Sequence, residues 1–202
     1  MSVSRKTKLV ISGFGAYRLS GTTEKGVLVN AESGTVQLIL DGATITNSDS
    51  AGLAITGGEK AVVTLAAGTE NTISDGGSDE TYDAAVYSTV PLVFEGEGSL
   101  TVLGRNQEGI STESTDMTFN GGSYTVTSAD DGIGAGGDGG TLTFNGGTFH
   151  INASGDGIDS NGDIVFNGGT IYVVGSSAGG DAGIDADSGF TINGGDIIAL
   201  GT

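Results

Sequence analysis

The sequence of 202 residues has no cysteine and a single proline, Pro91. Without cysteine, the chain can form neither a disulfide framework nor a thiolate metal site. The shortage of proline and the lack of a Gly-X-Y period argue against a collagen-like or proline-rich disordered chain, although 39 residues are glycine. The glycines are therefore expected to serve turns.

Basic residues are also scarce, with 7 Lys and Arg against 25 Asp and Glu, for a formal net charge of −18. Only Arg105 among them follows Lys60. Nucleic acid is not expected as a partner, because little in the chain could neutralise a phosphate backbone. Apolar runs of the roughly 20 residues needed to cross a bilayer are missing as well, and the start MSVSRKTK has no apolar signal core, so membrane insertion is not expected.

An internal repeat is the strongest positive signal. The block apolar-Asn-Gly-Gly begins at Phe119, Phe144, Phe166 and Ile192, with spacings of 25, 22 and 26 residues. A second marker, Gly-Ile with an acid shortly before it, keeps a similar period and starts at Gly109, Gly132, Gly157 and Gly183. Two independent markers with one period are typical of a solenoid, and about seven repeats fit the chain.

Within one repeat the apolar residues alternate, as Ile164 with Phe166 and Ile171 with Val173 do. A period of two over such short runs indicates strands. The sequence therefore predicts an all-β fold, a single-stranded right-handed parallel β-helix of about seven coils, with three short strands per coil. Two inward columns are expected to stack from coil to coil: Leu92, Met117, Leu142, Ile164 and Phe190, then Phe94, Phe119, Phe144, Phe166 and Ile192.

Residues 1–202 are expected to form one domain, in which residues 1–21 cap the N-terminal end and residues 22–202 form the coils. Exposed β edges invite pairing with another chain, so each end of the stack needs a cover. The C-terminal residues DIIALGT lie within a coil. This end is predicted to be open, either through truncation or for self-association.

Acidic residues flank each Gly-Ile strand, and equivalent residues of neighbouring coils lie about 5 Å apart. Two carboxylates at that separation repel by about 3 kcal/mol at an effective dielectric constant near 20. Without lysine or arginine in these coils, three solutions stay open: raised carboxylate pKa values, side chains that splay into water, or a hard cation. Calcium is favoured, because carboxylates and turn carbonyls are its usual ligands. The alternative is a set of solvated, turn-forming aspartates.

A further column of the repeat is expected to face solvent: Thr101, Thr125, His150 and Tyr172. A flat strip of hydroxyls beside an aromatic ring can bind a sugar, since pyranose rings stack on aromatics and bond to hydroxyls. The alternative is that β-forming residues populate an exposed sheet. Another column, Asn120, Asn145, Asn167 and Asn193, is interpreted as a structural ladder of side-chain amides.

Catalysis is not expected from these residues. A polysaccharide lyase needs a lysine or arginine base beside its calcium, and Arg105 is the only candidate in the acidic half of the chain. A glycoside hydrolase needs two carboxyl groups at a suitable separation, a condition that so many acids fulfil without specificity.

The chain resembles the bacterial carbohydrate-binding β-helix family, which is similar in fold to pectate and other polysaccharide lyases. The resemblance covers nearly the whole chain and is carried by GAYRLSGTTEKGVLVNAE, VQLILDGATIT, TLAAGTENTISDG and the recurrent DGI and FNGGT blocks. It implies an extracellular or cell-surface, non-catalytic module that binds calcium and recognises cellulose or an acidic plant cell-wall polysaccharide. The alternatives are a lyase or hydrolase of uronic-acid polymers and a calcium-rigidified adhesin. Carried over by position, the implied calcium ligands are Asp131, Asp156, Asp159, Asp163, Asp181, Asp185 and Asp187.

Overall fold

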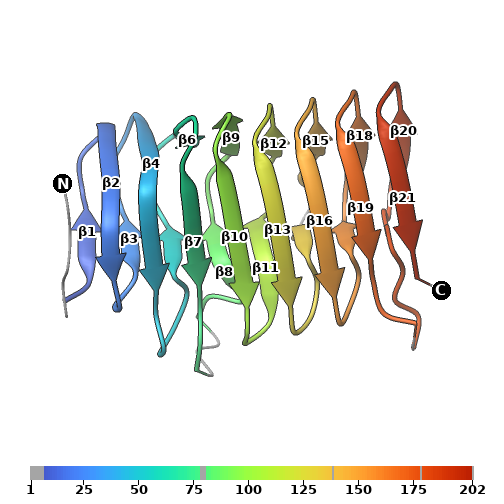
Figure 1. Ribbon diagram of the computed structural model, residues 1–202, viewed down its shortest axis with the longest axis horizontal. Helices are drawn as coiled ribbons and strands as arrows, with labels where there is room; N and C mark the ends of the chain where they lie inside the picture. Colours follow the sequence, from blue (N-terminus) through green and yellow to red (C-terminus); the bar gives the residue numbers. More distant parts are fainter. Residues whose placement is uncertain (1–6, 78–80, 138, 178, 202) are drawn as a thin grey trace.

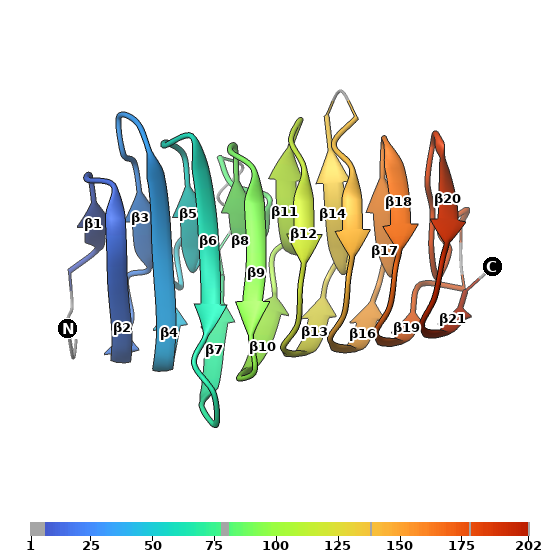
Figure 2. The same cartoon turned by 90° about the horizontal axis from the view of Figure 1, so that it is seen from above.

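The computed structural model describes residues 7–77, 81–137, 139–177 and 179–201. In this part of the chain the ordered elements are all strands, and no helix is long and apolar enough to cross a membrane. Figures 1 and 2 show coils following one another along a single axis, with the two termini at opposite ends. The strands pair in parallel and form a β-solenoid of about seven turns, so the predicted parallel β-helix is confirmed.

Each coil contributes strands to three faces. The short-strand face consists of β1 (Leu9–Ile11), β3 (Val27–Val29), β5 (Leu53–Ile55), β8 (Ala84–Ser88), β11 (Glu108–Glu113), β14 (Ile133–Gly136) and β17 (Ile158–Ser160). The other two faces join through the long strand β4 (Thr35–Thr46), along which β2 (Gly15–Thr23) pairs.

The Phe face continues from the first half of β4 through β6 (Lys60–Leu65), β9 (Leu92–Gly96), β12 (Met117–Phe119), β15 (Leu142–Phe144), β18 (Asp163–Phe166) and β20 (Gly189–Ile192). The Thr face continues from the second half through β7 (Glu70–Ser74), β10 (Ser99–Gly104), β13 (Ser123–Ser128), β16 (Thr148–Ala153), β19 (Thr170–Val174) and β21 (Asp196–Leu200). The core lies between the three faces.

The two predicted inward columns stack in the expected register. Neighbouring phenylalanine rings of the column that begins at Phe94 have their centroids 4.9 to 5.2 Å apart and lie nearly parallel. The rings of Tyr124 and Phe149 meet this column edge to face. All side chains of both columns are buried except Phe190 and Ile192, which are 58% and 55% exposed in the last coil.

The segment predicted as an N-terminal cap contains β1 and most of β2. Both strands pair in parallel with the next coil, β2 with a register shift between Leu19 and Gly21, so the described part of this segment forms the first coil of the stack. Residues 1–6 lie outside the described part.

The glycine of the Gly-Ile marker is required by the close approach of neighbouring coils. A Cβ atom on Gly132 would lie 2.4 Å from the carbonyl oxygen of Gly157, and one on Gly157 would lie 2.5 Å from that of Gly183. The Asn column also stacks as expected. Each amide Nδ2 of Asn145, Asn167 and Asn193 donates a 2.8 Å hydrogen bond to the Oδ1 of the preceding asparagine.

Candidate functional site

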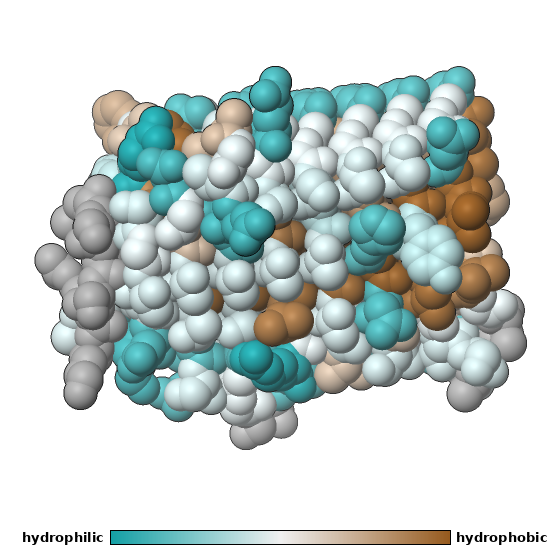
Figure 3. Space-filling model, in the orientation of Figure 1, coloured by the Kyte–Doolittle hydropathy of each residue, from teal (hydrophilic) through white to brown (hydrophobic). Residues whose placement is uncertain are grey.

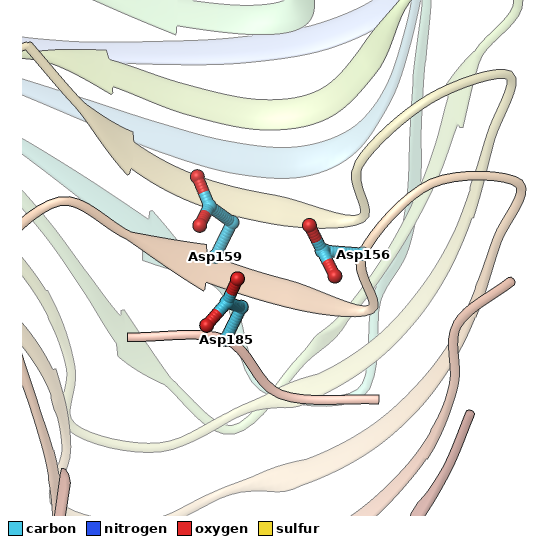
Figure 4. Close-up of side chains that lie close together, drawn as sticks. All are labelled: Asp156, Asp159 and Asp185. Atoms are coloured by element: carbon cyan, nitrogen blue, oxygen red, sulfur yellow. The ribbon is translucent and has the colours of Figure 1, made fainter. Parts of the chain in front are cut away.

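Three aspartates converge on the short-strand face in the last coils. Ile158 of β17 faces the core and pairs with Ile184 of the next coil. The residues that follow them, Asp159 and Asp185, therefore point outward. Asp156 lies in the turn just before β17. One carboxylate oxygen from each of the three lies within 4.8 Å of the others (Figure 4).

The other predicted calcium ligands lie at different distances from these three residues. Asp131 occupies the equivalent position one coil earlier, and its Oδ1 accepts a 2.6 Å hydrogen bond from the backbone N–H of Asp156. The charges of Asp181 and Asp187 act on Asp156 and Asp159, respectively. Asp163 is exposed at the start of β18 on the Phe face and is not part of the group.

Burial and neighbouring like charges raise the pKa values of several carboxyl groups in this region. Burial is the main cause that raises the pKa of Asp159 to about 6, and the charges of Asp156 and Asp185 add to it. The pKa of Asp131 is likewise raised to about 6, mainly by burial. Among the described residues the ion pairs are Arg18 with Asp41 and Lys25 with Asp49, both in the first coils. Within the described residues, none of these ion pairs includes Asp156, Asp159 or Asp185.

Two further acids extend the group: Glu108, the acid directly before the Gly109 marker, and Asp83; neither is among the calcium ligands that the resemblance implies. Burial, together with the charges of Asp83 and Asp131, raises the pKa of Glu108 to about 8. Burial also raises the pKa of Asp83. One buried oxygen of each, Oε2 of Glu108 and Oδ1 of Asp83, has no hydrogen-bond partner among the described residues. Alignment of Ala85-Val86 with the later Gly-Ile markers could have identified Asp83.

A second acidic contact lies in the same region of the short-strand face. The hydroxyl of Tyr87 donates a hydrogen bond to Oε2 of Glu113. The ring of Tyr87 also contacts that of Tyr82, with the centroids 5.2 Å apart. The acidic surface thus extends over several coils, from Asp83 to Asp187. Repulsion within this acidic strip can be relieved by raised carboxylate pKa values, by side chains that turn into water, or by a cation.

The candidate sugar-binding residues lie in one column on the Thr face. Thr101 pairs with Thr125, Thr125 with His150, and His150 with Tyr172. The rings of His150 and Tyr172 have their centroids 6.3 Å apart, and Tyr172 is 41% exposed. The column extends towards the N-terminus as Thr22, Thr44 and Thr72.

A second hydroxyl column lies beside the first, with Ser99, Ser123, Thr148 and Thr170 in register. Figure 3 shows the Thr face as a broad surface of intermediate hydropathy, with hydrophobic residues gathered at the end where the last coil lies. Such a surface offers repeated hydroxyls at the spacing of the strands, about 4.8 Å. It suits an extended ligand more than a small molecule that needs an enclosed pocket.

Known proteins give a consistent picture. A family model described as carbohydrate-binding domain-containing protein matches residues 5–201. A protein of the same description from Acetivibrio thermocellus is 35% identical over 135 residues, which are 62% of this chain and 46% of the relative; the match thus spans less than half of that relative. Among solved structures, the polysaccharide lyase-like protein from C. thermocellum, studied as a gadolinium derivative, superposes with a TM-score of 0.83 and 28% identity, covering 96% of this chain and 92% of the other.

Proposed function

Since the chain belongs to the carbohydrate-binding domain-containing protein family, we propose that it is a non-catalytic module that binds cellulose or an acidic cell-wall polysaccharide on its Thr face. The observation that carries this proposal is the unbroken outward column of Thr101, Thr125, His150 and Tyr172. Its place of action would be outside the cell or on the cell surface, where such polymers occur.

The column suits an extended glycan for two physical reasons. The β-solenoid holds the hydroxyls on a rigid scaffold, so few side chains must be ordered on binding. The aromatic rings of His150 and Tyr172 lie next to each other and are exposed, and they give a sugar ring an apolar surface to stack on.

The double variant with His150→Ala and Tyr172→Ala is expected to bind the glycan roughly tenfold more weakly, because it removes both rings. Affinity gel electrophoresis with a soluble cellulose derivative and with polygalacturonate measures this change. The matched control carries Thr118→Ala and Thr143→Ala, two neighbouring outward positions of the Phe face. Wild-type protein that migrates unretarded in every glycan gel would remove the proposal.

We also propose that calcium occupies the acidic strip. Asp156, Asp159 and Asp185 would hold the ion, with Asp131, Asp181 and Asp187 around it. The partnerless buried oxygens of Glu108 and Asp83 fit this view, since a buried carboxylate oxygen needs a hydrogen-bond donor or a cation. The similar solved protein was studied as a gadolinium derivative, and gadolinium, like calcium, is a hard cation that takes oxygen ligands. Calcium would neutralise the strip.

A polysaccharide lyase acting on uronic-acid polymers is the second candidate, favoured by the similarity to the solved polysaccharide lyase-like protein. A lyase cleaves with formation of an unsaturated sugar end, so absorbance of that product separates the two functions. Retarded migration without unsaturated product supports the binding module, and steady release of product by the pure protein supports the lyase.

Self-association is proposed for the last described coil. Its strands β20 and β21 expose Phe190, Ile192, Ile198 and Leu200, the hydrophobic end visible in Figure 3. A second copy suits this surface, because the basic residues gather in the first coils whereas the last coils hold acids such as Asp185 and Asp196 and no lysine or arginine. Contact between unlike ends is heterologous and can continue as a chain.

Sedimentation velocity over a concentration series is expected to show an average mass that rises with concentration. Replacement of Phe190 and Ile192 by lysine should lower this mass to that of the monomer, whereas the same change at Val10 and Phe14, exposed in and beside the first coil, tests the opposite end. A wild-type protein that stays monomeric throughout the series would contradict the proposal.

A further inference from the structure

A groove borders the Thr face at the ends of β2, β4, β7 and β10. Its volume is about 470 Å³, and its walls include Lys25, Thr46, Ser74, Asp75 and Arg105. Thr46 and Ser74 follow two residues after Thr44 and Thr72 of the hydroxyl column, so the groove runs directly beside that column.

Arg105 is held firmly in this groove. Its backbone N–H donates to Oδ1 of Asp75 at 2.5 Å, and the N–H of Asn106 donates to Oδ2 at 3.3 Å. Its guanidinium Nη1 donates to Oγ of Ser74 at 3.1 Å and to the carbonyl oxygen of Asp75 at 3.4 Å. Because Ser74 and Asp75 are buried, both ends of Arg105 are fixed to the solenoid.

The guanidinium contacts neutral acceptors and has no carboxylate within 4.0 Å among the described residues. Both of these hydrogen bonds are donated by Nη1, so Nη2 and Nε donate none to the described part of the chain. The carboxylate of Asp75 accepts hydrogen bonds from backbone amides. It thus holds the backbone at Arg105 in place without occupying the donors of the guanidinium group. Lys25 adds a second cation to the groove, paired with the exposed Asp49 at 2.7 Å, and Glu24 lines the same groove, so Arg105 is the cation that is left for an acidic ligand.

We infer that this groove is a subsite for the carboxylate of a hexuronate unit in an acidic polysaccharide that lies along the hydroxyl column. The inference rests on the proposed glycan-binding function and names the sugar class and the place of its charge. The planar fork of arginine matches the two oxygens of a carboxylate. A held guanidinium also loses little side-chain freedom on binding. In a protein with a net charge of −18, such a site gives a polyanion a favourable point of attachment.

The test compares trigalacturonate with cellotriose as probes, by isothermal titration calorimetry and by the NMR signal of the Arg105 Nε–H group in ¹⁵N-labelled protein. Arg105→Gln is expected to weaken trigalacturonate binding roughly tenfold or more and to leave cellotriose binding unchanged, since only the acidic probe has a charge for the fork. Arg105→Lys keeps the charge and loses the planar fork. Its affinity for trigalacturonate is expected to lie between those of the wild type and Arg105→Gln. Arg18→Gln, an exposed arginine paired with Asp41, is the matched control and should change neither affinity.

Arg105→Gln also removes the guanidinium bonds to Oγ of Ser74 and to the carbonyl oxygen of Asp75, so its melting temperature is measured, and Arg105→Lys replaces it if folding is impaired. A shift of the Arg105 signal on addition of trigalacturonate, with the expected loss in the variants, supports the subsite even if cellotriose does not bind. Equal affinity of wild type and both variants for trigalacturonate, or an unmoved Arg105 signal at saturation, overturns the subsite and leaves glycan binding on the Thr face intact. Absence of trigalacturonate binding overturns the subsite as well, and cellotriose then decides the proposed function separately.

Discussion

Calcium is expected to raise the melting temperature of the protein by about 5–10 °C when its free concentration reaches about a hundred times the dissociation constant. An ion that binds only the folded chain at this concentration adds about 2.7 kcal/mol to the free energy of unfolding. For a chain of this size, each kcal/mol shifts the melting temperature by about 2–4 °C. Differential scanning calorimetry of protein treated with EDTA and then titrated with calcium measures the effect.

Asp159→Asn separates an ion site from a solvated acidic surface, because its effect should change sign with calcium. In EDTA the variant is expected to be more stable than the wild type, since it removes one of several repelling carboxylates. In calcium it is expected to be less stable than the wild type, since it has lost a charged ligand. Asp163→Asn, at an exposed position on the Phe face, is the matched control. Identical melting curves of the wild type in calcium and EDTA would refute the calcium site.

The repeat predicted the fold well because a solenoid converts sequence period directly into contact. Once Phe119, Phe144 and Phe166 recur at one coil length, parallel pairing places each ring on the next, and the structure stacks them with centroids 5.1 to 5.2 Å apart. The same logic placed Thr125, His150 and Tyr172 in one outward column. The stacked columns of side chains within one face can therefore be predicted from the spacing of residues in the sequence.

The acidic site could be predicted only in part, because a turn decides which face a residue reaches. Asp159 and Asp163 are four residues apart, yet the turn at Asn161 and Gly162 carries the chain from the short-strand face to the Phe face between them. Spacing in the sequence does not show this change of direction. Asp163 therefore belongs to a different surface from the aspartates with which the resemblance grouped it.

The sequence also does not show which carboxylate is buried, because burial depends on which side chains are missing from the neighbouring coil. A Cβ atom on Gly134 would lie 3.0 Å from Oε2 of Glu108, so the missing side chain at Gly134 is what lets Glu108 lie flat on the neighbouring coil. Its carboxyl group then loses water and faces Asp83 and Asp131. The groove at Arg105 escaped the sequence for a similar reason. It is formed by the ends of four strands from successive coils, and no single segment contains it.

The metal-free protein is expected to be more stable at pH 5 than at pH 8. The pKa of Glu108 rises from an ordinary value of 4.5 to about 8, and those of Asp131 and Asp159 rise from 3.8 to about 6. The folded chain therefore binds protons more tightly than the unfolded chain. This contribution to stability is complete below the unfolded values and is lost as the pH rises through about 6 for the aspartates and about 8 for Glu108. With one pKa unit equivalent to about 1.4 kcal/mol, and a reduction for the partly exposed aspartates, the loss is on the order of 5 kcal/mol.

Thermal melts in EDTA from pH 4.5 to pH 9 measure this slope, and Glu108→Gln assigns its upper part. The variant cannot ionise at position 108, so its stability should fall mainly around pH 6 and then level off, whereas Glu97→Gln, at an exposed turn between β9 and β10, should follow the wild type. Calcium at pH 8 should restore much of what the wild type loses, because the cation replaces the protons as the source of positive charge. A metal-free wild type whose melting temperature climbs from pH 5 to pH 8 would show that these carboxylates ionise without cost, and the acidic strip would then have no need of a cation.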